Sequence, residues 1–236
     1  MNWHSLLDFS PSELVAIRLS LKVAVWAVFI SLPPGILVAL ILARARFYGR
    51  ELLDVVVHLP LILPPVVTGY FLLLLFGRRG PLGHFFYQTF GITFAFRWTG
   101  AVLASAVVAF PLMVRAIRLS IEAVDRRLED AAATLGAAPV WVFLTVTFPL
   151  ILPGIIAGAI LSFARSLGEF GATITFVSNI PGETQTLPTA LYTFTQVPGG
   201  DEGALRLTVV SVCISACALL MSEFLARRVA RKVAGL

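Results

Sequence analysis

Residues 23–43 have the sequence VAVWAVFISLPPGILVALILA, a stretch of 21 residues without a charged side chain. An α-helix rises about 1.5 Å per residue, so a helix of this length can cross the roughly 30 Å hydrocarbon core of a bilayer. A surface helix of a soluble protein needs a polar face toward water, and this stretch has no such face. The stretch therefore predicts a transmembrane helix.

The composition of the whole chain leads to the same conclusion. Of 236 residues, 58% are hydrophobic and 13% are charged, against roughly 25% charged residues in a soluble protein. The mean hydropathy is +0.91. We expect an all-α polytopic membrane protein with a single transmembrane domain over residues 1–236, in contact with membrane lipid. The net charge is +5, but the basic residues stand in short groups between apolar runs, which argues against nucleic-acid binding.

Four further uncharged runs follow, at residues 55–77, 98–114, 131–164 and 207–222. The run at 131–164 is too long for one straight helix and contains Gly136, Pro139, Pro149 and Pro153. We expect it to divide into a membrane-surface segment and a span from about Leu150. With flanking arginines that reach toward water, the pattern predicts about five transmembrane helices, at residues 14–44, 53–76, 98–118, 150–172 and 206–226.

Positive charge is unevenly distributed between the two sets of loops. One set contains eleven basic residues, which are Arg44, Arg46, Arg50, Arg115, Arg118, Arg126, Arg127, Arg227, Arg228, Arg231 and Lys232. The other contains four, Arg78, Arg79, Arg97 and Arg206, or six with Arg18 and Lys22. The positive-inside rule places the first set in the cytoplasm, which predicts an outside N-terminus and a cytoplasmic C-terminus. Asp8 and Glu13 precede the first run where a signal peptide has basic residues, so we expect this segment to remain attached.

The chain lacks the sequence signals of an enzyme or a cofactor-binding protein. A P-loop ends in Gly-Lys-Ser/Thr, and neither Lys22 nor Lys232 follows a glycine. The three histidines are scattered, so we expect no metal site. Cys213 and Cys217 lie one helical turn apart in the last span, where we interpret them as small packing residues; a redox or metal pair would need further ligands. We expect neither catalysis nor a cofactor in this chain.

The second span carries three prolines within six residues, at Pro60, Pro64 and Pro65. Each proline removes a backbone donor and clashes with the preceding turn, so the helix must kink or break. In hydrocarbon, a broken helix is tolerated against protein or around a water-lined cavity. Pro64, Pro65, Thr68 and Gly69 are therefore candidates for a transport pathway. The alternative is a structural kink packed on neighbouring helices.

The fourth span contains Arg165 and Glu169, four residues apart. Residues at this spacing share one face of a helix and can pair. Ionisable side chains within a membrane commonly mark functional sites. We interpret the pair as part of an outer gate or as the lock that supports it. The alternative is an ion pair at the outer interface that only joins helices.

Residues 121–149 form the loop between the third and fourth spans, on the side that the charge distribution assigns to the cytoplasm. Apolar residues recur there at helical spacing, at Val124, Leu128, Ala131, Ala132 and Leu135. Gly136 is expected to end this short amphipathic helix in a left-handed conformation, and Pro139 prevents its continuation. Such a helix rests on lipid headgroups or docks into a groove of a soluble partner, and the spacing alone leaves both alternatives open.

A motif with defined spacing lies in this loop. Asp130-Ala131-Ala132 is followed by three residues and Gly136, and then by nine residues and Val146-x-Phe148-Pro149. The pattern resembles the EAA loop of ABC importer permeases, which is E-A-A, three residues, G, nine residues and I-x-L-P. Asp, Val and Phe here replace Glu, Ile and Leu. In that family the loop forms a coupling helix in a cleft of the ATPase subunit. The resemblance implies that Asp130, Ala131, Ala132 and Gly136 form the ATPase-coupling site.

The apolar segments resemble one branch of that family. Residues 59–70, 76–83 and 164–173 are similar to those of molybdate permeases, whereas residues 181–188 are shared in outline with sulfate and thiosulfate permeases. The resemblance extends from about Leu14 to the C-terminus. It implies the ABC importer permease fold with a cytoplasmic coupling helix, and a homodimer in the bacterial inner membrane. It also implies two copies of an ABC ATPase subunit and a periplasmic molybdate-binding protein.

The function that this resemblance implies is passage of molybdate or tungstate through the dimer. Weak, dispersed donors suit a dianion that must be released, and the candidates are Thr68, Ser162, Thr173 and Thr175. Three alternatives stay open: a sulfate or thiosulfate permease, a standalone ion-coupled carrier, and a membrane scaffold that does not transport.

Overall fold

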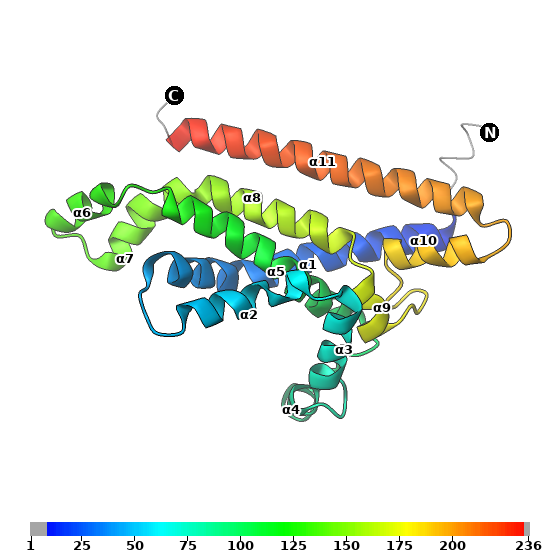
Figure 1. Ribbon diagram of the computed structural model, residues 1–236. Helices are drawn as coiled ribbons and strands as arrows, with labels where there is room; N and C mark the ends of the chain where they lie inside the picture. The colour runs from blue at the N-terminus through cyan, green and yellow to red at the C-terminus, as the bar shows by residue number, and fades with distance from the viewer. Residues whose placement is uncertain (1–8, 234–236) are drawn as a thin grey trace.

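The computed structural model describes residues 9–233, and every regular element in this part of the chain is a helix (Figure 1). Asp8, which bears on the signal-peptide argument, lies outside the described residues, and so do the side chains of Arg227, Arg231 and Lys232 from the charge count. Four long helices make up the body: α1 (Pro11–Arg44), α5 (Trp98–Glu122), α8 (Phe148–Leu167) and α11 (Asp201–Val233). The predicted all-α fold is confirmed.

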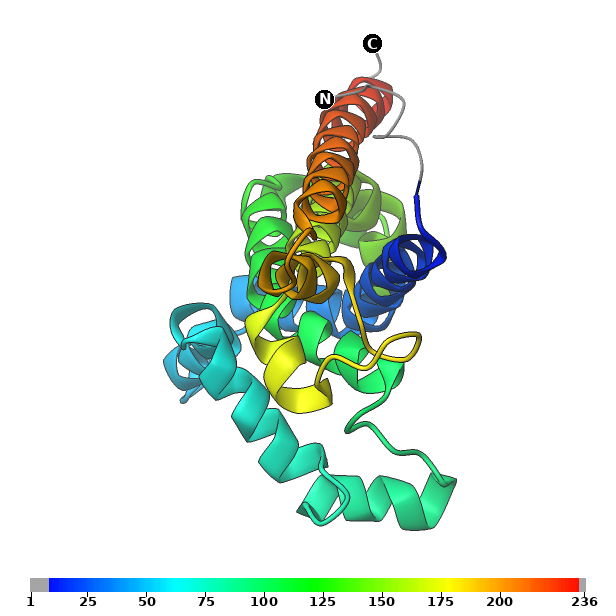
Figure 2. The same ribbon diagram turned by 90° about the vertical axis from the view of Figure 1, so that its right-hand side faces the viewer.

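Helix α5 is the centre of the bundle and packs against both α1 and α8. The residues that it buries include several small ones in its first half, among them Gly100, Ala101, Ala104, Ser105 and Ala109. Small side chains let helix backbones approach closely, and in lipid this van der Waals packing replaces the hydrophobic effect as the force between helices. Helix α11 packs on α8 and lies along the outside of the bundle, with most of its apolar surface exposed (Figures 1 and 2).

The proline-rich segment breaks the second span, as predicted. Helices α2 (Arg50–Ile62) and α3 (Pro65–Phe76) are bent by 114° relative to each other. Pro65 lies in the first turn of α3, where a missing N–H leaves no hydrogen bond unmade. With α4 (Pro81–Phe90), which the sequence did not predict, α3 projects away from the bundle (Figure 2). The segment expected at 53–76 is therefore not a straight crossing.

The fourth span differs from its prediction at both ends. A helix runs without a break from α7 (Pro139–Val142) through a π-helical turn, Phe143–Thr147, into α8, so no division occurs near Leu150. A π-helical turn is wider than an α-helical one, and it accommodates the ring and missing N–H of Pro149. Helix α8 ends at Leu167, before residue 172, because the chain turns at Gly168 and resumes as the short helix α9 (Gly171–Val177).

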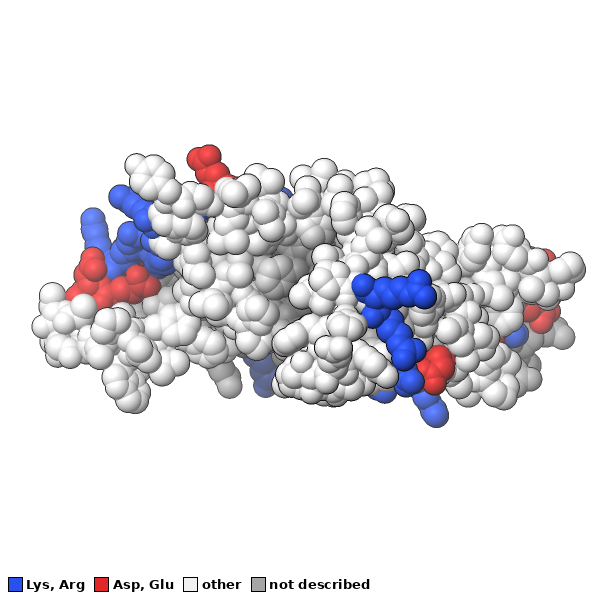
Figure 3. Space-filling model, turned by 90° about the horizontal axis from the view of Figure 1, so that it is seen from below, with Lys and Arg blue, Asp and Glu red and all other residues white. Residues whose placement is uncertain are grey.

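Within residues 9–233, four helical stretches are long and apolar enough to span a membrane, and the bent α2–α3 pair makes a fifth if it is one crossing. The end of α1, α6 (Arg126–Thr134) and the end of α11 lie at one end of the bundle, and α10 (Leu187–Gln196) lies at the other (Figure 1). Seen from below, one group of charged side chains lies at the end where α6 is, a second lies to the right of the middle, and uncharged side chains cover the broad stretch between them (Figure 3). This distribution is typical of a multi-pass membrane protein.

Candidate coupling and transport sites

Helix α6 stands at the tip of the bundle, with a defined start and a defined end (Figure 1). The side chain of Asp125 caps it by accepting a hydrogen bond of 3.0 Å from the backbone N–H of Arg127. At its other end Gly136 has a φ of +85°, the left-handed conformation that the sequence predicted. The N–H of Ala137 donates to the carbonyl of Ala132 across this turn, at 3.3 Å. The turn sends the chain back into α7.

The surface of α6 is open, because no residue of this helix is buried. Asp130 and Ala131 are exposed, and Ala132 is half-buried. Two large apolar side chains are also uncovered, since Leu128 is 50% and Leu135 is 89% exposed. The predicted coupling residues are thus brought together on an accessible apolar surface at the end of the bundle.

Glu129 connects α6 to two other elements by hydrogen bonds, and the sequence analysis did not identify it. Its Oε1 atom accepts a bond of 3.0 Å from Nη2 of Arg44, the last residue of α1. The same oxygen accepts a bond of 2.7 Å from the hydroxyl of Thr147, at the end of the π-helical turn. Both partners are distant in the sequence, so no local spacing could have revealed them.

Helix α3 packs against α9, and this contact unites several of the predicted pathway residues. A Cβ atom on Gly69 would lie 2.6 Å from the carbonyl oxygen of Ala172, and one on Gly171 would lie 2.7 Å from Cβ of Pro65. Glycine is required at both places because the two backbones touch. The sequence had placed Gly69 in the pathway without indicating this close approach.

Arg165 and Glu169 form the predicted ion pair, with 2.7 Å between Nη1 and Oε2. They do so across the end of α8, since Glu169 follows the turn at Gly168 and does not continue the helix. The other carboxylate oxygen of Glu169 accepts a bond of 2.8 Å from the N–H of Ala172 in the first turn of α9. A side chain that is 1% exposed therefore has both oxygens satisfied and joins two helices.

Each hydroxyl group proposed as an anion donor is either buried or hydrogen-bonded to a backbone carbonyl. Thr68 and Ser162 are buried, and neither hydroxyl has a hydrogen-bond partner within the described residues. Thr173 donates to the carbonyls of Glu169 and Phe170, and Thr175 donates to that of Gly171. A hydroxyl has one proton to donate, so Thr173 and Thr175 are not free donors. In the single chain, Thr68, Ser162 and Thr173 are buried and Thr175 is half-buried.

These features agree with comparisons to known proteins. Residues 35–231 match the family described as binding-protein-dependent transport system inner membrane component. The chain belongs to this family.

Two curated relatives are similar to this permease in sequence, and one solved structure is similar to it in fold. It is 61% identical over 223 residues to the molybdenum transport system permease protein ModB of Escherichia coli strain K12, covering 94% of this chain and 97% of the relative. It is 37% identical over 239 residues to the sulfate transport system permease protein CysT of Salmonella typhimurium, covering 100% of this chain and 85% of the relative. A bacterial ABC transporter that imports alginate has a similar fold, with a TM-score of 0.73, 17% identity, and coverage of 97% and 84% of the two chains.

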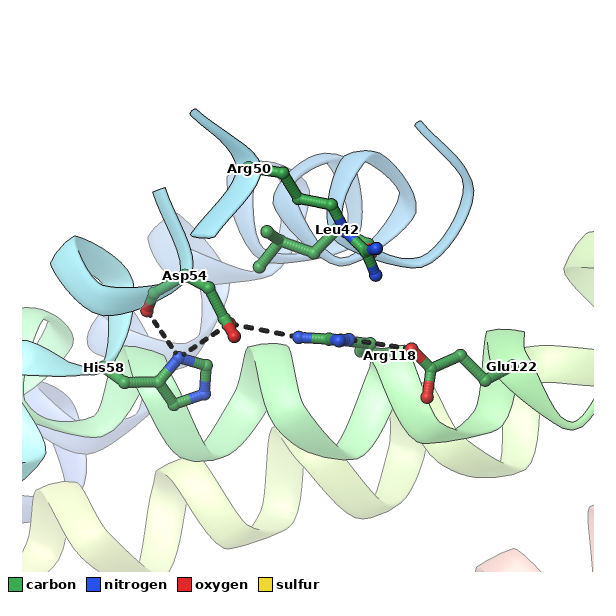
Figure 4. A network of polar contacts seen from close by, with 6 residues as sticks. All are labelled: Leu42, Arg50, Asp54, His58, Arg118 and Glu122. Atoms are coloured by element: carbon green, nitrogen blue, oxygen red, sulfur yellow. Dashed lines mark hydrogen bonds and ion pairs between the residues drawn. The ribbon is translucent and has the colours of Figure 1, made fainter. Parts of the chain in front are cut away.

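A second polar network lies in the permease where α2 meets α5, and sequence reasoning missed it (Figure 4). Arg118 of α5 bridges two carboxylates, with 3.1 Å to Asp54 and 2.9 Å to Glu122. Asp54 also contacts the ring of His58, at 3.2 Å. A groove of about 730 Å³ adjoins this network at the loop between α1 and α2. The network fixes the start of the broken span to the central helix.

The cysteine pair of the permease differs from its prediction. Cys213 and Cys217 are exposed on α11, so they do not serve as packing residues within this chain. Cys217 borders an apolar groove between α1, α8 and α11, together with Phe29 and Phe163. The two cysteines are exposed because α11 lies at the periphery of the bundle, and the apolar sequence of the span does not reveal this position.

Proposed function

We propose that this permease forms, as a homodimer, the pathway by which a bacterial ABC importer moves molybdate across the inner membrane. Two ATPase subunits power it from the cytoplasm, and a periplasmic molybdate-binding protein supplies the anion. The N-terminus is outside and the C-terminus is cytoplasmic. The substrate class is supported by the relative at 61% identity that is named for molybdenum transport, against 37% for the relative named for sulfate.

The exposed helix α6 is the single observation that carries the coupling role. Its accessible surface includes Asp130, Ala131 and Leu135, and the turn at Gly136 holds it at the tip of the bundle. An apolar helix surface of this kind suits a groove in a soluble partner. Because the chain has no P-loop, ATP hydrolysis belongs to that partner.

The broken span supports the proposed homodimer. Between α2 and α3 the backbone leaves helical geometry, and within a bilayer such a break must face protein or water. The apolar side chains beside it, including Val55, Ile62, Phe71 and Leu74, are exposed in the single chain. A second copy facing this surface encloses the break and completes the wall of the pathway. The Arg165–Glu169 pair then supports the outer gate, next to the α3–α9 contact.

The decisive experiment is transport in proteoliposomes that contain the permease and its ATPase, with the binding protein supplied outside. Uptake of radioactive molybdate should require ATP and the binding protein, and tungstate should compete while equal sulfate should not. Preferential uptake of sulfate would assign the chain to sulfate transport. Uptake that needs an ion gradient instead of ATP would make it a standalone carrier, and absence of uptake with full assembly would favour a scaffold.

A further inference from the structure

Helix α6 has little apolar packing to hold it, because it buries none of its own residues and packs against α7 and the π-helical turn. The chain from Leu135 to Thr147 already connects α6 to α8 covalently. No such connection leads to α1, which ends at Arg44. Among the described residues, the bond from Arg44 to Glu129 is the polar contact that ties α6 to α1.

Helix α1 is well placed to transmit a displacement from α6. It is a helix of 34 residues that packs along α5 and α8, and at its far end it contacts α10. Its last residue, Arg44, carries a positive charge at the negative end of the helix dipole, which favours that charge there. Helix α1 stays continuous across Pro33 and Pro34, so a movement applied at Glu129 is passed to a single helix that reaches the opposite end of the bundle.

The π-helical turn adds a third element to the contact between α6 and α1. A π-helical turn holds an additional residue compared with an α-helix, which changes the directions of the side chains that follow, and such turns are frequent at functional sites. Thr147 ends the turn and is buried, and its hydroxyl donates to the same oxygen of Glu129 that binds Arg44. One carboxylate oxygen thus joins α6, the end of α1 and the start of α8.

We propose that Glu129 is a positioning residue that couples movement of α6 to α1 and α8, separate from the surface of α6 that contacts the ATPase. Asp130 and Ala131 make the exposed contact, and Glu129 transmits the force inward. This inference rests on the proposed role of α6 as the coupling helix. Loss of Glu129 uncouples ATP hydrolysis from transport, whereas loss of the exposed surface prevents assembly.

The test measures three quantities in proteoliposomes with the ATPase and the binding protein: assembly with the ATPase, the rate of ATP hydrolysis, and molybdate transported per ATP. Glu129→Gln and Arg44→Met should assemble and hydrolyse ATP, with molybdate per ATP reduced about fivefold or more, the size of a typical coupling between sites. Arg44→Lys, which keeps the charge, should retain most of the ratio. The double variant Arg44→Met/Glu129→Gln should be no worse than either single variant, because the two residues act through one contact.

Two controls separate the possible failures. Glu51→Gln removes an exposed carboxylate at the same end of the bundle that forms no ion pair or side-chain hydrogen bond among the described residues, and it should behave as wild type. Ala131→Arg alters the exposed surface of α6 and should abolish assembly. If Ala131→Arg assembles and transports normally, the coupling role of α6 is wrong. If Ala131→Arg fails while Glu129→Gln and Arg44→Met keep the wild-type ratio, the role of Glu129 alone is overturned. If Glu129→Gln does not accumulate in the membrane, the molybdate transported per ATP by Arg44→Met is compared with that by Arg44→Lys, which tests the same contact.

Discussion

Glu13 and Arg206 lie 193 positions apart in the sequence and form an ion pair, with 3.0 Å between Oε1 and Nε. Glu13 is fully buried near the start of α1, where its other oxygen accepts from the backbone N–H of Ser10 in a capping box. Arg206 is in the first turns of α11. The pair therefore joins the outer helix α11 to α1 at the end of the bundle opposite α6.

Arg206→Met should destabilise the permease because it leaves the carboxylate of Glu13 buried without its cation. Removing one partner of a buried pair costs about 3 kcal/mol. The measurement is the midpoint of thermal unfolding in detergent, followed by size-exclusion chromatography. Glu202→Gln is the control: its side chain is 78% exposed and 3.9 Å from Arg206, so its midpoint should not change. Equal midpoints for both variants would show that the buried pair does not stabilise the fold.

Gly69→Ala should disturb the contact between α3 and α9, because its Cβ would lie 2.6 Å from the carbonyl oxygen of Ala172. Overpacking of this kind costs about 1–3 kcal/mol, and we expect reduced abundance together with slower molybdate uptake. Gly168→Ala is a nearby control, since its Cβ would meet no atom closer than 4.0 Å. Wild-type uptake by Gly69→Ala would mean that α3 and α9 can separate without loss of function.

Gly136→Val should prevent assembly with the ATPase while the permease stays in the membrane. Nothing lies within 4 Å of the added Cβ, so the effect comes from the φ of +85°, which is costly for a β-branched residue. Gly136→Asn should assemble, because asparagine tolerates this conformation. Co-purification with the ATPase distinguishes the two. Retention of the ATPase and of uptake by the valine variant would contradict the coupling assignment.

Substitutions of Arg165 and Glu169 should not be additive, and replacing Glu169 should have the larger effect. Glu169→Ala removes both the ion pair and the bond to the N–H of Ala172, whereas Arg165→Ala removes the ion pair alone. We expect the glutamate variant to lose more stability, and Glu169→Gln to recover part of that loss by keeping an acceptor for Ala172. A double-mutant cycle on abundance, ATP hydrolysis and uptake measures the interaction. Additive effects would show no interaction, and full activity of the double variant would end the gate proposal.

Topology can be tested by cysteine labelling after Cys213 and Cys217 are replaced by serine. Arg127→Cys on α6 should be protected from an impermeant thiol reagent in intact cells, and Asp201→Cys at the start of α11 should be labelled. Both positions are exposed, whereas the neighbouring Gly200 is buried and its Cβ would collide with the carbonyl of Phe194. The opposite pattern would place α6 outside the cytoplasm and overturn the predicted orientation.

The parts of this permease that the sequence alone determined depend on local physics. Uncharged runs predicted its helices because an apolar backbone in lipid must satisfy its hydrogen bonds within the helix. Pro64 and Pro65 predicted the break, and Gly136 predicted a left-handed turn, because both effects arise from the sterics of one or two residues. The spacing from Asp130 to Pro149 indicated the family because this motif is one continuous stretch of the chain and can be recognised without knowing the fold.

The tertiary structure decided which distant residues meet. The partners of Glu129 are 85 and 18 positions away, Glu13 and Arg206 are 193 apart, and Gly69 touches Ala172 across two helices. The end of α8 at Gly168 and the exposure of Cys213 likewise depend on how whole helices pack. The composition of an apolar run does not indicate which helices it will contact, because lipid and the protein interior are almost equally apolar. Close packing and buried ion pairs decide which helices pack together.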